Sequence, residues 1–200
     1  MKGIEFLGTS LGTVREFPAQ AKREAGHELD RVQRGLDPTD WKPMKSVGPG
    51  VREIRIQQEG QYRVIYVATF KDRVYVLHAF QKKTQKTSKR DLEAAKRALK
   101  EVNERQNVMS KNAPFESVWD ALEDDPVRRE NLKLRSELMI KISETIKARS
   151  LKQQDAADLL QISQPRVSAL MKGKIDEFRL DTLVDLAHRL GLHVSINVAA

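Results

Sequence analysis

Three closely spaced segments in the first half of the chain decide its fold: "VREIRIQ" at residues 51–57, "QYRVIYVATF" at residues 61–70 and "RVYVLHAFQ" at residues 73–81. Each segment is rich in β-branched and aromatic side chains, which favour extended strands. The connections "QEG" and "KD" are short enough for tight reversals of the chain. The pattern therefore predicts three antiparallel strands joined by two hairpins.

Helices and one further strand are expected around these three strands. Residues 3–7 predict a short strand, and residues 10–36, which Pro18 interrupts, predict a helical hairpin. Residues 37–50 are predicted to form a loop, and a final helix is expected over residues 88–105, with a serine as its N-cap. The first half thus predicts a small α+β domain, in which a helix pair packs on an antiparallel sheet of three or four strands.

The alternation of side chains along the strands indicates where positive charge is presented. In the first strand Arg55 shares a face with Val51 and Glu53, and we expect Arg55 to point out of the core. Arg63 lies on the second strand, and the third strand is followed by a cluster of lysines: Lys82, Lys83 and Lys86. We expect these cations to converge on one face of the sheet and to form an anion site.

The net charge of the chain, +8, comes entirely from its first half. Residues 1–108 hold 22 basic and 14 acidic side chains, whereas residues 109–200 hold 14 of each. Stretches of about 100 residues are long enough to bury a core of their own. We therefore predict two domains, 1–108 and 109–200, and expect the basic first domain to bind a phosphate-containing partner.

Composition excludes several kinds of site. The chain has no cysteine, which excludes disulfides and thiolate metal ligands, and its four histidines show no ligand spacing. We expect neither a metal nor another cofactor. No apolar run reaches the roughly 18 residues that span a membrane, and the N-terminus lacks the pattern of a secretory signal. These features predict a cytoplasmic protein that makes no contact with a membrane.

The order of "VREIRI", "YRVIY" and "VYVLHAFQKKTQKT", followed by an alanine-rich helix, resembles the RelE-like toxin family, specifically its HigB and phage-derived branch, over residues 2–105. These toxins are messenger-RNA endonucleases that usually act on the ribosome. The resemblance implies that the basic domain cuts RNA by attack of the RNA's own 2′-hydroxyl. Two alternatives stay open: a related toxin branch that poisons DNA gyrase, and a non-enzymatic transcription regulator whose basic half only adds affinity for nucleic acid.

The resemblance also implies roles for the cations. Arg63 would stabilise the pentacoordinate phosphate and Arg55 would help to hold it, since preorganised cations supply a large part of such catalysis. The lysine cluster would bind the RNA backbone or assist proton transfer, for which a lysine needs a lowered pKa. His78 is a further catalytic candidate, although its place in an apolar strand also suits a core histidine. No clear tyrosine follows the last strand, so the general acid is unassigned.

The second half is decided by "LKQQDAADLLQISQPRVSALMKGKIDEFRLDTLVDLAHRLGL" at residues 151–192. It predicts a helix at about residues 153–160, a tight turn, and a second short helix that follows Ser163 and ends at Gly173. A long amphipathic helix precedes this helix-turn-helix. Residues 112–198 resemble the XRE family and, within it, HigA-type antitoxin repressors. We expect an all-α domain that ends in a short strand.

The resemblance places the second helix of the motif in the major groove of DNA, where its first residues reach base edges. Gln164 can pair with adenine and Arg166 with guanine. Other polar side chains are better placed for phosphates, which position the protein without specifying sequence: Gln153, Ser168, Lys172 and Lys174. Because one helix covers few base pairs, we expect a homodimer on operator DNA.

The stretch "FESVWDALEDDP" at residues 115–126 places apolar side chains at helical spacing among acids: Phe115, Val118, Trp119 and Leu122. It is too short to have a core of its own. Two arrangements stay open. The segment packs on the long helix of its own domain, or it docks on the basic half as a toxin–antitoxin interface, with its acids near the lysines.

These observations predict a toxin–antitoxin pair in one chain. The first half would cut mRNA on the ribosome, and the second would neutralise it and repress the operon that encodes both. The polar stretch from Met109 resembles a translation start, which is consistent either with a natural fusion or with two joined reading frames.

Overall fold

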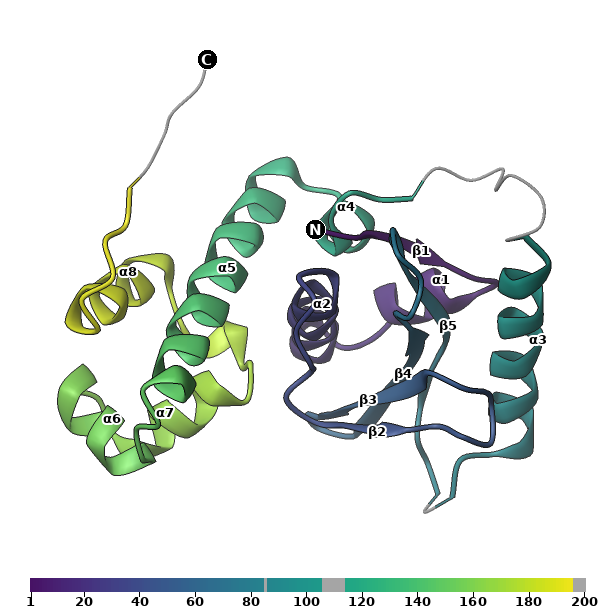
Figure 1. Cartoon of the computed structure of the whole chain (residues 1–200), viewed down its shortest axis with the longest axis horizontal. Coiled ribbons are helices and arrows are strands. Elements are labelled where there is room, and N and C mark those ends of the chain that lie inside the picture. The colour runs from purple at the N-terminus through teal and green to yellow at the C-terminus, as the bar shows by residue number, and fades with distance from the viewer. Residues whose placement is uncertain (85, 106–113, 196–200) are drawn as a thin grey trace. The chain divides into compact units, whose positions relative to one another are not determined.

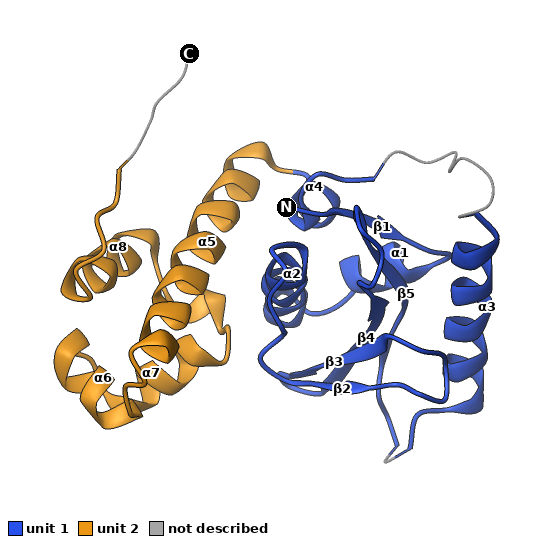
Figure 2. Ribbon diagram, in the orientation of Figure 1, with its two compact units in different colours: residues 1–124 blue, residues 125–200 orange. Residues whose placement is uncertain are grey.

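The computed structural model describes residues 1–84, 86–105 and 114–195, and it divides into two compact units, Met1–Asp124 and Asp125–Ala200 (Figure 2). A sheet with helices makes up the first unit and the second is helical, which confirms the predicted α+β class. The predicted boundary at residue 108 and the joint at Met109 lie outside the described residues. The division into domains 1–108 and 109–200 therefore stays a prediction.

Five strands form one sheet in the order β1-β5-β4-β3-β2: β1 (Gly3–Phe6), β2 (Trp41–Pro43), β3 (Val51–Gln57), β4 (Gln61–Val67) and β5 (Arg73–Gln81). The predicted hairpins β3–β4 and β4–β5 are confirmed. The sheet is not purely antiparallel, however, because β1 lies parallel to β5 at one edge. Local patterns carry no information on strand direction once two helices separate a strand from the rest of its sheet.

Strand β2 lies in the stretch that was predicted to be a loop. It is three residues long and pairs antiparallel with β3, so that Trp41 lies opposite Ile54. The guanidinium carbon of Arg52 lies 4.1 Å from the centroid of the Trp41 ring. A strand this short shows no alternation in the sequence, and its pairing with β3 rather than local propensity creates it.

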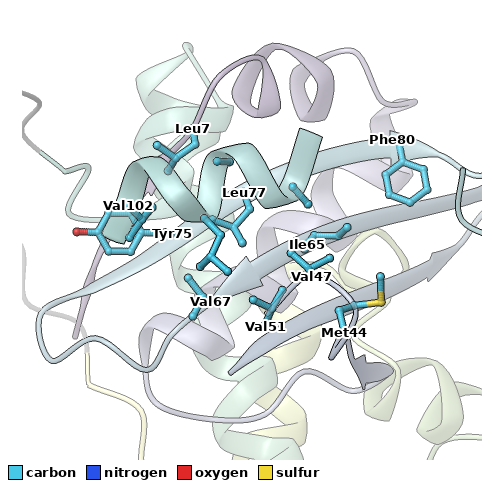
Figure 3. Close-up of a cluster of buried hydrophobic side chains, with 13 residues drawn as sticks. Leu7, Met44, Val47, Val51, Ile65, Val67, Tyr75, Leu77, Phe80 and Val102 are labelled. Carbon is cyan, nitrogen blue, oxygen red and sulfur yellow. The ribbon is translucent and has the colours of Figure 1, made fainter. Parts of the chain in front are cut away.

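Helices cover both faces of the sheet (Figure 1). Helices α1 (Ser10–Arg15) and α2 (Ala19–Gln33) form the predicted hairpin, with the break at Pro18, and lie on one face. Helix α3 (Lys89–Arg105) begins directly after Ser88 and lies on the other face. The core between α3 and the sheet is apolar (Figure 3) and includes Leu7, Val51, Ile65, Val67, Leu77 and Val102.

A short helix that follows in the sequence, α4 (Val118–Leu122), belongs to the first unit and not to the helical one. Ser117 caps it, because Ser117 Oγ accepts a hydrogen bond from Trp119 N and Asp120 Oδ2 accepts one from Ser117 N. Just before the helix, Phe115 pairs with Ile4 of β1 in an antiparallel bridge. Of the two predicted arrangements, docking on the first half is the one that the structure shows.

The second unit contains four α-helices among its described residues, α5 (Pro126–Ala148), α6 (Gln153–Leu160), α7 (Gln164–Met171) and α8 (Leu180–Arg189), and a short 3-10 helix, η1 (Ile175–Glu177). Asp125 caps α5 by accepting a hydrogen bond from Val127 N at 2.9 Å. Gln161 adopts a left-handed conformation, with φ of 53°, and so makes the tight turn between α6 and α7. The predicted C-terminal strand falls partly on residues 196–200, outside the described residues, and residues 192–195 form no strand. None of the helices described here has the length and apolarity required to cross a bilayer.

Candidate functional site

The register of β3 and β4 brings the two predicted arginines together. Arg55 lies directly opposite Arg63, and Phe80 of β5 lies opposite Arg63 on the other side. Directly paired residues share a face of the sheet. Val51 and Ile65 lie on this same face and pack against α3. The predicted convergence of Arg55 and Arg63 on one face is therefore what the structure shows.

Arg63 is a buried cation, with only 4% of its surface exposed. Its guanidinium donates hydrogen bonds to Tyr62 O at 2.8 Å and to Gln61 Oε1 at 2.9 Å, and its Nε lies 3.5 Å from Glu53 Oε1. Desolvation lowers the pKa of Arg63, while the charge of Glu53 acts in the opposite direction. The side chain is thus held in one orientation, as a preorganised charge has to be.

Each of the two arginines is paired with a carboxylate, Arg63 with Glu53 and Arg55 with Asp40. The sequence pattern did not predict these pairs. Glu53 is fully buried and lies 3.4 Å from Lys42 Nζ as well as close to Arg63. Arg55 is half-exposed and donates from Nε to Asp40 Oδ1 at 2.8 Å. Glu53 could have been suspected from its place on the same strand face as Arg55, whereas Asp40 and Lys42 come from a stretch without a strand pattern.

His78 lies on the same side of the sheet and is held by the start of α3. Its Nε2 lies 2.9 Å from Asp91 Oδ1, Ser88 Oγ donates to Asp91 Oδ2 at 2.5 Å, and the ring stacks on Phe80 with 5.5 Å between centroids. The side chain is partly exposed, so it is not an enclosed core histidine. A serine followed three residues later by an acid is a helix-start signal, which could have pointed to Asp91.

The lysine cluster extends from the end of β5 to the start of α3. Lys82 N donates to Gln61 O at 2.7 Å and continues the ladder of β4 and β5 by one bond, while Lys83 and Lys86 are exposed. Lys86 also lines a shallow hollow with Lys42 and Lys45, two lysines outside the predicted site. The hollow adjoins β2 and the start of α3, so this rim of the first unit is strongly positive.

Among the residues that the structure describes, no three or more histidine, aspartate or glutamate side chains form a group that could hold a metal ion.

Of the predicted DNA-binding residues, Gln153 lies on α6, Gln164, Arg166 and Ser168 lie on α7, and Lys172 and Lys174 follow the end of α7. Gln153, Gln164, Arg166 and Lys172 are exposed, and Ser168 and Lys174 are half-exposed. The guanidinium of Arg166 lies 5.1 Å from the centroid of the Phe178 ring, and its Nη2 is 3.4 Å from Glu177 O. Ala157 of α6 and Val167 of α7 are buried, and the two helices contact one another.

Comparison with known families identifies both units. Residues 13–100 match the family described as Phage derived protein Gp49-like (DUF891), and residues 121–199 match the family described as Helix-turn-helix domain. The chain joins a Gp49-like domain to a helix-turn-helix domain. This result confirms the predicted relation to RelE-like toxins and to XRE-type helix-turn-helix antitoxins. The comparison with curated proteins gives no match.

Residues 114–124, whose end overlaps the second matched region, pack on the first unit through α1, α2 and β1. Trp119 is 1% exposed, and Leu122 is buried beside it in α4. Its acid Asp124 forms an ion pair with Arg15 of α1, at 2.9 Å, and not with the lysine cluster. The expectation that its acids lie near the lysines is therefore wrong for Asp124. This ion pair is exposed to solvent, so burial of the Trp119 ring against Gly26 of α2 contributes more to holding the segment than charge does.

Proposed function

We propose that the Gp49-like domain is an endoribonuclease toxin that cuts mRNA on the ribosome, and that the helix-turn-helix domain is its antitoxin and represses its own operon. The observation that supports the first part is the pairing of Arg55 with Arg63 on a sheet face whose rim carries Lys42, Lys82 and Lys86. Such an array suits a polyanion whose phosphate becomes more negative during the reaction.

The residues of this face fit the steps of a reaction in which the 2′-hydroxyl attacks the adjacent phosphate. Arg63 supplies a fixed charge for the developing negative phosphate, and Arg55, which is half-exposed, can exchange Asp40 for a phosphate oxygen. His78 is the group suited to proton transfer, with Asp91 orienting its ring. The lysines bind the backbone on either side of the cut.

Translating ribosomes provide the test of this activity. Residues 1–124, the whole first unit, should produce new mRNA ends, and replacing Lys82, Lys83 and Lys86 by alanine should reduce cleavage by roughly 10²-fold or more because three backbone contacts are lost together. The matched control removes the same charge elsewhere, at the exposed Lys71, Lys96 and Lys100, and should keep cleavage within a few-fold of the parent. Circular dichroism establishes that each variant is folded.

Three outcomes separate the candidate functions. New mRNA ends that disappear in the triple variant support the endoribonuclease. Unchanged mRNA with accumulation of cleaved DNA in the presence of gyrase would identify a gyrase poison. A folded first unit that affects neither substrate would leave a transcription regulator without enzymatic activity.

For the helix-turn-helix domain we predict how two substitutions change its affinity for operator DNA. Arg166→Ala should weaken binding by about 1–3 kcal/mol and relax the preference at one base pair, whereas Lys172→Ala should weaken binding to all sequences alike. Titration of specific and random duplexes at one fixed salt concentration measures both effects. Equal losses on the two duplexes for Arg166→Ala would contradict base reading by this side chain.

A further inference from the structure

A hollow beside the edge strand β2 presents the ring of Trp41. This tryptophan hollow has a volume of about 530 Å³, and its lining includes Trp41, Pro43, Lys45, Pro49 and Arg52. The volume lies within the range of roughly 300–1,000 Å³ that is usual for ligand pockets. The described part of the lining combines an aromatic ring, two proline rings and two cations, and it contains no acid. Such a combination suits a nucleotide, which joins a flat base to a negative phosphate.

Strand pairing sets the orientation of the Trp41 ring. Trp41 and Pro43 lie on one face of the sheet, opposite Ile54 and Arg52 of β3. The guanidinium of Arg52 stacks on the indole, 4.1 Å from its centroid, and Arg52 Nη1 donates to Asp37 Oδ1 at 2.5 Å. A fixed cation therefore covers one side of the ring. Trp41 remains partly exposed, so the ring can still receive a base.

The connection between β2 and β3, which lines the tryptophan hollow, is fixed by the core of the domain. Met44 and Val47 point into the core between α3 and the sheet (Figure 3), and Met44 N donates to Val51 O at 2.8 Å. Gly48 packs against α3 so closely that a Cβ atom on it would overlap Leu99 Cδ2. The hollow is therefore preformed, which reduces the loss of conformational freedom when a ligand binds.

A second hollow adjoins the first and is positively charged. This lysine hollow, of about 560 Å³, shares Pro43 and Lys45 with the tryptophan hollow and adds Lys42 and Lys86. Lys42 lies opposite Glu53, and therefore on the sheet face of the two paired arginines. The lysine hollow thus connects the proposed catalytic face with the tryptophan hollow around the edge strand.

We propose that the edge of β2 is a subsite for the substrate strand, in which Trp41 stacks on one unpaired base of the RNA and Lys42, Lys45 and Lys86 hold the adjoining phosphates. The inference rests on the proposed endoribonuclease function and concerns a part of the RNA that lies away from the cut. Stacking tolerates every base because each has a π-face. The subsite would therefore align the strand on the catalytic face without requiring one sequence.

An RNA strand that cannot be cut separates binding from cleavage. A labelled 2′-O-methyl oligonucleotide lacks the attacking 2′-hydroxyl group, and an abasic oligonucleotide of the same length keeps the phosphates and lacks the bases. Fluorescence anisotropy at one fixed salt concentration measures the affinity of the full chain for each. We expect the intact strand to bind roughly 10-fold more tightly than the abasic strand, as for one stacked base. Binding of the intact strand should also quench tryptophan emission.

Substitutions of Trp41 test whether the ring is the stacking partner. Trp41→Ala should weaken binding of the intact strand by roughly 10-fold and change binding of the abasic strand by less than about twofold. Trp41→Phe keeps a flat ring and should bind the intact strand within about threefold of the parent. The quenching should disappear in Trp41→Phe, because the other tryptophan of the chain, Trp119, is buried.

A lysine substitution tests the phosphate part of the subsite. Lys45→Ala should weaken binding of both strands alike and reduce the salt dependence by about one counterion. Lys71→Ala removes an equally exposed charge from the connection between β4 and β5 and is the matched control, which should change neither quantity. Circular dichroism establishes that each variant is folded.

The cleavage assay on translating ribosomes identifies which RNA contacts Trp41. If the ring stacks on the mRNA, Trp41→Ala should change the relative use of the cut sites, because stacking strength differs between bases. A fall by the same factor at every cut site would assign the ring to ribosomal RNA and overturn the assignment to the substrate strand.

Binding of the two oligonucleotides can also overturn the proposal. Equal affinity of the parent for the intact and abasic strands would show that no base is stacked. An equal loss on both strands in Trp41→Ala would show that the ring acts through the fold and not on a base. Binding of the uncut strand does not depend on cleavage. New mRNA ends without base-dependent binding would therefore contradict the subsite alone, and base-dependent binding without new mRNA ends would contradict the proposed enzyme alone.

Discussion

Trp119 and Arg63 are both almost inaccessible to solvent, at 1% and 4% of their surface, within the same domain, yet they are buried for different reasons. Trp119 fills an apolar slot against Gly26. Arg63 is surrounded by groups that replace its hydration, namely Gln61, the carbonyl of Tyr62 and the carboxylate of Glu53. Burial of the ring depends on shape and area, whereas burial of the guanidinium depends on compensation of its charge.

The largest effect is expected from Trp119→Ala, which should destabilise the full chain by about 3–5 kcal/mol because it empties the slot at Gly26. Denaturant unfolding monitored by circular dichroism measures the loss. Trp119→Leu, which refills much of the volume, should recover part of it. If the leucine and alanine variants were equally destabilised, filled volume would not be what holds α4.

A loss of similar size, about 3–5 kcal/mol, is expected from Arg63→Ala, because it leaves the buried Glu53 without its arginine. An apolar replacement of similar length, Arg63→Met, should not restore stability, in contrast to the apolar replacement of Trp119. Combining Arg63→Met with Glu53→Gln should restore much of it, since no uncompensated charge then remains. A double variant no more stable than Arg63→Met would show that charge compensation is not the reason for the burial.

Arg63 contributes both to the stability of the fold and to the proposed catalysis. A variant that removes the guanidinium changes both the fold and the proposed catalysis, so loss of RNA cleavage in Arg63→Ala has two explanations. Arg63→Lys keeps a positive charge near Glu53 and removes only the fork of donors. Its cleavage rate, compared with its stability, separates the two effects.

Glu28 is a third buried group, and its ionisation should change the free energy of unfolding with pH by about 3 kcal/mol at most. Burial raises the pKa of Glu28 from 4.5 to about 7, although Thr39 donates two hydrogen bonds to its carboxyl group. The folded state therefore binds this proton more tightly than the unfolded state, and the contribution of Glu28 to stability falls as the pH rises from about 4.5 to about 7. Glu28→Gln cannot ionise and should lose this part of the pH dependence.

Unfolding free energies of both proteins at pH 5 and pH 8 give the measurement for Glu28. The parent should lose more stability than Glu28→Gln between these two values. Parallel losses in the two proteins would show that Glu28 ionises in the folded state as easily as in the unfolded state.

Much of the fold followed from local patterns. Alternation and short connections predicted β3, β4 and β5, Pro18 marked the break between α1 and α2, and Ser88 marked the start of α3. The same alternation placed Arg55 and Arg63 on one face. It did not predict that Arg63 is buried, because burial there depends on Glu53 and Gln61, whose orientation relative to Arg63 is set by strand pairing.

The sequence by itself determined the two-part architecture, the three central strands, the helix-turn-helix and the excess of cations in the first half, because these properties depend on composition and on neighbours within one turn or one hairpin. Only the tertiary structure decided three other features: the parallel pairing of β1, the contact of His78 with Asp91, and the seat of Trp119 on Gly26. Each depends on residues that are distant in the chain. Such contacts form where side chains fit in shape and charge in three dimensions, and the periodicity of residues along the sequence does not predict them.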